Sequence, residues 1–119
     1  LALRPAGAVG VDLAVLPPPW GAGRAALRQQ AALYLGPAHA AARGDDAAQP
    51  AARLATCFVQ GWADLEARLK CIEQPLAEWS PALAQRLAAC HAAALVLPPD
   101  IAAHLPTEAA ASVAWRDAA

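Results

Sequence analysis

The sequence carries little net charge and no long apolar run, and each absence excludes a class of function. Nine basic and ten acidic residues give a formal charge of −1, with no basic cluster that could follow a phosphate backbone, so nucleic-acid binding is disfavoured. No uninterrupted apolar stretch reaches the roughly 18 residues of a transmembrane helix. We therefore expect no membrane span, and because the first residues, LALRPAG, lack the basic segment and long apolar run of a secretory signal, we expect no such signal there.

Cysteine is scarce, and its spacing suits neither a metal site nor a disulfide framework. The three cysteines, Cys57, Cys71 and Cys90, are an odd number and lie far apart in the sequence. A structural zinc site needs pairs of ligands separated by only a few residues. Cys90 and His91 are adjacent, but neighbouring side chains point in different directions on a helix. We therefore expect buried free thiols in a reducing compartment, with no metal and no other cofactor.

Aromatic residues are also few, and this limits the core. The chain has 119 residues, which fits a single domain spanning residues 1–119. Hydrophobic residues make up 58% of it, but alanine supplies much of that share, and alanine favours helix while burying little area. Leucine, valine, isoleucine and the rare aromatic rings must therefore form most of the core.

Residues 1–16 have the pattern of a short β-hairpin. Val11, Leu13 and Val15 alternate with a small and an acidic residue, which is the period of a strand. Glycine and proline before them supply a turn after a first strand over residues 1–4. Two strands alone are marginal in water, so we expect this hairpin to lie on the helices or to pair with the edge of another chain.

The remainder of the chain predicts helices. The strongest signal is a continuous apolar face at helical spacing, formed by Leu54, Phe58, Trp62, Leu65, Leu69 and Ile72. Ser80 followed by Pro81 is a helix start signal. The predicted helices cover 21–35, 50–73, 81–96 and 108–117, with a loop over 38–49. The expected fold class is mainly α: a small helical domain of about four helices with a short N-terminal β-hairpin.

Gly61 interrupts the apolar face of the 50–73 helix. Glycine inside a helix costs about 1 kcal/mol relative to alanine. A neighbour pressed against the backbone at this position would account for it, so we expect a close contact at Gly61.

Residues that could carry catalysis are not arranged as known nucleophilic sites. Cys57 or Cys90 could be paired with His91 or His104, but no local sequence resembles a nucleophile elbow or a cysteine-protease signature. The acidic pairs read as a loop tip and a solvated helix face rather than as two carboxylates across a cleft. We therefore predict that the protein is not an enzyme, and keep a small thiol enzyme using Cys90 and His91 as a weaker alternative.

Four tryptophans are many for so small a core. One interpretation is that two fill the core while the others lie at a partner interface, where tryptophan is enriched. The other is that all four belong to the core. The two interpretations stay open at the level of sequence.

The order of features resembles the small tail assembly chaperones of long-tailed bacteriophages and related gene-transfer particles. The resemblance covers roughly residues 1–105: a hairpin (LRPAGAVGVDLAVLPPP), a helix (WGAGRAALRQQAAL), a helix reaching Gly-Trp (FVQGWADLE), and a helix opened by Pro-Leu-x-x-Trp-Ser (PLAEWSPALAQRL). It implies a non-enzymatic role in which such proteins bind tape-measure and tail-tube subunits during assembly. Trp62, Trp79 and the Leu65–Leu69 region are the positions that correspond.

From these observations we expect a non-enzymatic protein–protein adaptor. The first expectation for its setting is bacteriophage tail or particle assembly. The alternative is a structural subunit of a virion or of another multi-protein complex. The expected location is the cytoplasm of a bacterial host or a virion, the expected partners are proteins, and a homo-oligomer is a further option. The residues expected to bind the partner are Trp20, Trp62, Leu65, Leu69, Trp79 and Trp115.

Overall fold

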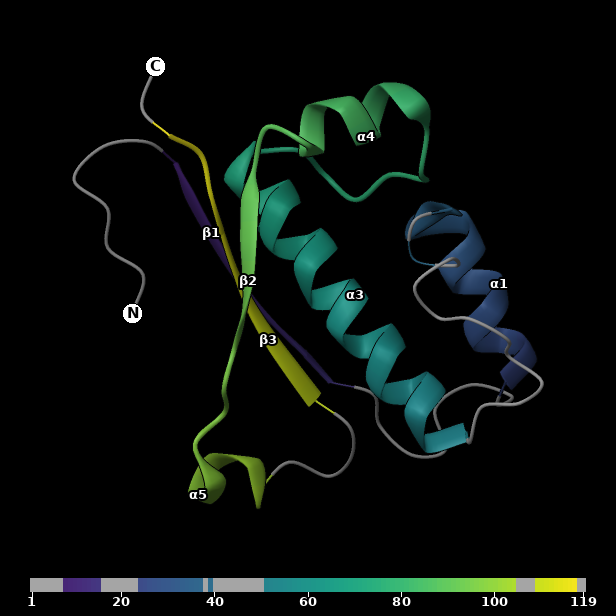
Figure 1. Cartoon of the computed structure of the whole chain (residues 1–119), viewed down its shortest axis with the longest axis vertical. Coiled ribbons are helices and arrows are strands. Elements are labelled where there is room, and N and C mark those ends of the chain that lie inside the picture. Colours follow the sequence, from purple (N-terminus) through teal and green to yellow (C-terminus); the bar gives the residue numbers. More distant parts are fainter. Residues whose placement is uncertain (1–7, 16–23, 38, 40–50, 105–108, 118–119) are drawn as a thin grey trace.

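A computed structural model of the chain describes residues 8–15, 24–37, 39, 51–104 and 109–117. A sheet lies on one side of the long helix α3, and α1 lies on the other side (Figure 1). The elements in chain order are β1 (Val9–Val15), α1 (Arg24–Tyr34), α3 (Ala51–Cys71), α4 (Pro81–Leu87), β2 (His91–Leu95), α5 (Pro99–Ala102) and β3 (Ala109–Trp115).

The predicted fold class, mainly α with a hairpin, is wrong. The described part of the chain combines four helices with a three-stranded antiparallel sheet in the order β1-β3-β2, which makes it a mixed α/β protein. The strand period of the N-terminal segment did predict β1. Its described partner, however, is the C-terminal strand β3, with Val9 opposite Trp115 and Val15 opposite Ala109. Residues 1–4, expected as the partner strand, lie outside the described residues.

Two predicted helices are wholly or partly strands. The helix predicted over 81–96 ends at Leu87, and its second half forms β2, whereas the helix predicted over 108–117 is β3. Both segments are rich in alanine, which favours helix in isolation. In the fold, their small side chains lie in a sheet, β3 beneath α3, and this tertiary packing overrides the intrinsic preference.

The other helix predictions are confirmed. α1 lies within 21–35 and α3 within 50–73. α4 begins after Ser80 as expected, because the Ser80 hydroxyl accepts a hydrogen bond from the Leu83 N–H at 3.1 Å. The loop predicted over 38–49 lies outside the described residues apart from His39.

Small residues on one face of the sheet allow α3 to approach its backbone closely. Directly paired residues of an antiparallel sheet share a face, so this inner face consists of Gly10, Ala14, Ala92, Ala94, Ala110, Ser112 and Ala114, together with Asp12. The α3 residues in contact with it are also mostly small: Val59, Ala63, Ala67 and Cys71. At Gly10 a side chain would overlap the Ala67 carbonyl oxygen and lie 2.7 Å from the Cys71 nitrogen. Ala63, Ala67 and Ala114 are fully buried.

The other sides of α3 hold its larger apolar residues. Phe58 packs with Leu27 and Ala31 of α1, and Leu65 and Leu69 pack with Leu83 and Leu87 of α4. Of the predicted apolar face of this helix, Leu54, Phe58, Leu65 and Leu69 are buried within the chain, and Trp62 and Ile72 are partly buried. The close neighbour expected at Gly61 is also confirmed, because a Cβ there would lie 2.9 Å from His39 Nδ1 and 3.1 Å from Leu35 Cδ1.

Replacing Gly10 with alanine should destabilise the fold. The added methyl group collides with the backbone of α3, which cannot shift without moving the whole helix, so we expect the free energy of unfolding to fall by about 1–3 kcal/mol or more. Urea denaturation followed by circular dichroism measures this change.

Gly61→Ala is the matched control. The methyl group added there meets side-chain atoms of His39 and Leu35, and alanine gains about 1 kcal/mol of helix propensity, so the two effects largely offset each other. Equal destabilisation by the two substitutions would show that the close approach at Gly10 is not a constraint on the fold.

Candidate functional site

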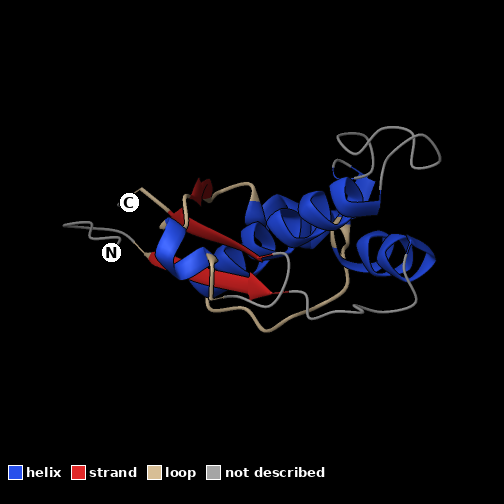
Figure 2. Cartoon of the chain, turned by 90° about the horizontal axis from the view of Figure 1, so that it is seen from below, coloured by secondary structure: helices blue, strands red, loops and turns tan. Residues whose placement is uncertain are grey.

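The face of the sheet turned away from α3 is apolar and open among the described residues. In Figures 1 and 2 the helices α3 and α1 lie to one side of the sheet. The strand register places three rows that cross all three strands on the opposite side, which we call the outer face: Val9–Trp115–His91, Val11–Val113–Ala93 and Leu13–Ala111–Leu95. The second and third rows contain no polar side chain.

Large apolar side chains are exposed on this outer face. Val11 is 46% exposed, Leu13 50% and Leu95 41%. Val96, which directly follows β2, is 94% exposed. Soluble monomers rarely leave such residues together unless they meet a partner.

One end of the outer face is polar. The His91 ring lies 5.6 Å from the Trp115 ring between centroids, and His91 Nε2 lies 3.2 Å from Asp117 Oδ2. The face therefore has an apolar centre with a polar group at its rim, the arrangement found in protein interfaces.

The residues expected to bind a partner are spread over different parts of the structure. Trp115 lies on the outer face. Leu65 and Leu69 are buried, 6% and 1% exposed, against other helices of the same chain. Trp62 is partly buried, with its ring centroid 5.7 Å from that of Phe58. Trp20 lies outside the described residues.

Trp79 holds the segment before α4 against the end of α1. The backbone N–H of Trp79 donates to the Leu33 carbonyl at 2.7 Å. The indole of Trp79 packs on Gly36, whose φ of 79° is in the left-handed region. A side chain at Gly36 would overlap the indole. Trp62 and Trp79 thus both stabilise the helical side of the protein.

Sequence reasoning missed Val11, Leu13 and Leu95 as surface residues. The alternation of Val11 and Leu13 with smaller residues predicts that they share one face of a strand, but large apolar residues are expected to face the core. In this sheet the small residues face inward because α3 lies so close to Gly10. Gly10, next to residues with the strand period, was the available signal, because glycine in a strand marks a close backbone approach.

A cavity of about 410 Å³ lies between α1, α3 and α4, lined among others by Tyr34, His39, Asp64, Arg68 and Trp79. Its two charged side chains hold the fold together. Asp64 accepts hydrogen bonds from the hydroxyl of fully buried Ser112 and from the Gln60 amide.

Arg68 donates to two carbonyl oxygens where α4 gives way to β2, those of Leu87 at 3.1 Å and Cys90 at 2.6 Å. The Leu87 carbonyl also accepts the Cys90 N–H, so these bonds attach the turn between α4 and β2 to α3. The carboxylate and the guanidinium of the cavity are therefore engaged in fixing β3 and α4 to α3.

The cysteines have the chemistry of structural thiols. All three are free, and Cys71 and Cys90 are buried in one cluster with Ala67 and Ala114, whereas Cys57 is partly exposed. Burial raises the pKa of the Cys90 thiol, and a hydrogen bond with Cys71 raises it further. Cys90 therefore stays protonated at neutral pH, which makes it a poor nucleophile.

Within the described ranges, no group of three or more histidine, cysteine or acidic side chains is placed to hold a metal ion. None of the helices in that part of the chain combines the length and the apolar character that a membrane crossing requires.

The cysteines should differ in their reaction with iodoacetamide. We expect partly exposed Cys57 to be alkylated first at neutral pH and buried Cys90 much later. Because the pKa of Cys90 is raised, its alkylation should accelerate only as the pH becomes alkaline. Mass spectrometry of peptides from a time course measures the order. Rapid labelling of Cys90 at neutral pH would restore the thiol-enzyme alternative.

The chain was compared with protein-family models, with curated protein sequences and with solved structures, and none of them matches. The arrangement of the chain's own residues therefore has to indicate its function. The open outer face is the most prominent feature of that arrangement.

Proposed function

We propose that this protein is a non-enzymatic protein–protein adaptor that binds its partner through the outer face of the sheet. The observation that carries this proposal is the apolar centre of that face, with Val11, Leu13 and Leu95 each near half exposure. Because the central rows hold no charged side chain, the matching surface of the partner must be apolar and uncharged.

Covering this face makes a favourable contribution to binding. Full burial of a valine or leucine side chain is worth about 1.5–3 kcal/mol, so each half-exposed residue retains roughly 1 kcal/mol. Trp115 at the end of the face adds a large ring of the kind enriched at binding hot spots.

The state of the reactive groups supports binding rather than catalysis. The Cys90 thiol is buried and held in its protonated form. Asp64 and Arg68, the charged groups of the cavity, are bonded to the backbone and side chains that build the fold. A protein that only buries apolar surface needs no activated group.

Within the adaptor class we propose a role in bacteriophage tail or particle assembly, in the host cytoplasm. The resemblance of FVQGWADLE and PLAEWSPALAQRL to tail assembly chaperones supports this setting. The alternative remains a structural subunit of a virion or another complex, since a subunit would also bury the outer face. The two differ in persistence: a chaperone leaves the finished particle, whereas a subunit stays at fixed copy number.

The proposal is tested by affinity purification of the tagged chain from its native source, comparing the natural sequence with Leu13→Asp. A charge among the exposed apolar side chains of the outer face should weaken partner recovery at least tenfold, because the carboxylate must be desolvated on binding. Mass spectrometry of the co-purified proteins and of purified particles identifies the partner and its persistence.

Leu33→Asp is the matched control. Leu33 is 39% exposed but lies on α1, away from the sheet, so it should leave recovery unchanged. Equal loss in both variants would indicate general destabilisation. Full recovery with Leu13→Asp would overturn the assignment of the outer face, and absence of any specific partner would overturn the adaptor function.

A further inference from the structure

The backbone of β1 can be oriented from one hydrogen bond beyond its end. The Arg116 N–H donates to the Ala8 carbonyl at 3.0 Å, which makes these two residues a hydrogen-bonded pair. Bonded and non-bonded pairs alternate along an antiparallel ladder. Val11 opposite Val113 is therefore a non-bonded pair, and the N–H and C=O of Val11 point away from β3, toward the free edge of β1.

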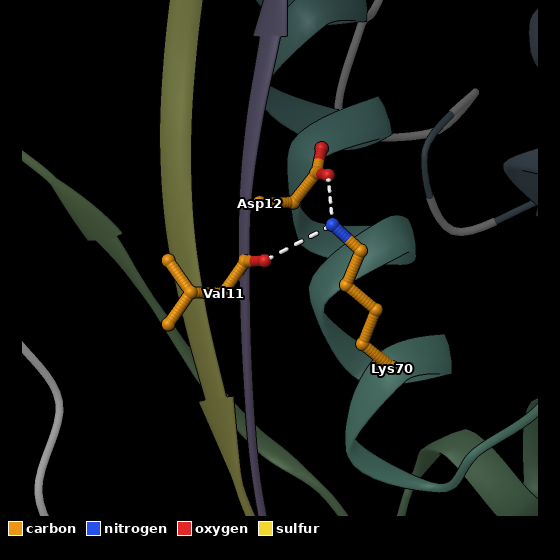
Figure 3. A network of polar contacts seen from close by, with 3 residues as sticks. All are labelled: Val11, Asp12 and Lys70. Atoms are coloured by element: carbon orange, nitrogen blue, oxygen red, sulfur yellow. Dashed lines mark hydrogen bonds and ion pairs between the residues drawn. The ribbon is translucent and has the colours of Figure 1, made fainter.

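Charged side chains block this edge of β1 against pairing with a further strand, and we call it the guarded edge. Lys70 of α3 reaches the edge, where its ammonium group donates to the Val11 carbonyl at 3.2 Å and pairs with Asp12 at 2.7 Å (Figure 3). A further strand would have to displace Lys70 and leave Asp12, whose side chain is only 14% exposed, without its cation. Lysine at a sheet edge is a known means of preventing strand addition.

Among the described residues, no charged side chain guards the edge of β2 in this way. By the same alternation, the backbone N–H and C=O of Val113 point toward β2 and form hydrogen bonds with Ala93. The Ala93 carbonyl also accepts a hydrogen bond from the Ser112 hydroxyl at 3.1 Å. The N–H and C=O groups of Ala92 and Ala94 therefore point away from β3. No other described residue forms a hydrogen bond with them, and β2, HAAAL, contains no lysine, proline or acidic residue.

We propose that two copies of this chain join through their β2 edges, forming one continuous six-stranded antiparallel sheet. A two-fold axis at Ala93 sets Ala92 of one copy opposite Ala94 of the other, so that both sets of free backbone groups are paired. His91 then lies opposite Leu95, so no two like charges meet. The methyl side chains of the alanines leave room for the strands to approach.

Charges beyond the ends of β2 match the same arrangement. α4, before the strand, has the basic residue Arg86 in its last turn, and α5, after the strand, has the acidic residue Asp100 in its first turn. Antiparallel pairing directs the α4 end of one copy toward the α5 end of the other, where the signs are opposite. Val96, 94% exposed and directly after β2, lies at the seam and would be covered.

The difference between the edges also determines where association stops. Because β2 is open and β1 is guarded, each copy offers one pairing edge, and a closed dimer results instead of a growing sheet. The dimer does not depend on the adaptor function, since it concerns the purified chain alone. If both proposals hold, pairing joins two outer faces into one wider surface.

The test is sedimentation velocity of the purified full chain over low to high micromolar concentration. We expect a mass approaching twice the chain mass of 12.2 kDa at high concentration. Ala94→Pro removes an outward N–H without breaking a bond to β3, and the two bonds lost in a symmetric dimer should weaken association about tenfold or more. Ala94→Lys, which keeps the N–H but adds a charge at the edge, should do the same.

Ala82→Lys is the matched control, since Ala82 is exposed on α4 and away from the edge, and it should preserve the dimer. Hydrogen exchange gives a second readout, in which the amides of Ala92 and Ala94 lose protection on dilution while that of Ala93 keeps it. A chain that stays monomeric throughout would overturn the proposal. So would a dimer that survives both Ala94 variants, or one abolished by Leu13→Asp alone, which would place the contact on the outer face.

Removing the guard on β1 should change the assembly. With Asp12→Ala and Lys70→Ala combined, each copy has two open edges, so we expect species larger than a dimer at concentrations where the natural chain forms only the dimer. If this double variant stops at two copies, the ion pair is not what limits the assembly.

Discussion

The contact between α3 and the backbone of the sheet at Gly10 is the constraint on which the rest of this structure depends. A helix can lie so close to a sheet only if small residues face each other across the contact, and alanine, glycine and serine occupy nearly all of these positions. The larger apolar residues of α3 are then used on its other sides, against α1 and α4. Those of β1 and β2 are turned to the outer face.

Helices and strands whose signals are local could be predicted from the sequence. The apolar period of α3, the Ser80 cap of α4 and the strand period of β1 all depend on nearby residues, and each is present in the structure. β2 and β3 could not be predicted in this way, because an alanine-rich segment becomes a strand only when a distant helix covers it. Their assignment as helix followed correctly from local preference and failed for a tertiary reason.

The same limit applies to the candidate site. Trp115 was recognised as a candidate, but its neighbours on the outer face come from both ends of the chain and meet only through the register of β3 with β1 and β2. Leu65 and Leu69 were expected to bind a partner because an apolar helical face predicts burial but does not show what covers it. Here the described cover is α4 of the same chain. Likewise, which edge of the sheet is guarded and which is open could not be predicted, because this depends on the strand order.

The position of β3 has a consequence for biosynthesis. It is the central strand of the sheet but follows both β1 and β2 in the sequence, so these two strands have no described partner strand until residues 109–115 have been synthesised. Pairing of Val9 with Trp115 joins residues far apart in the sequence, and contacts so distant in sequence form slowly. During synthesis the inner surface of α3 is therefore uncovered, and a nascent chain interrupted before β3 has no sheet. Formation of β3 is therefore what joins β1 and β2 into one sheet.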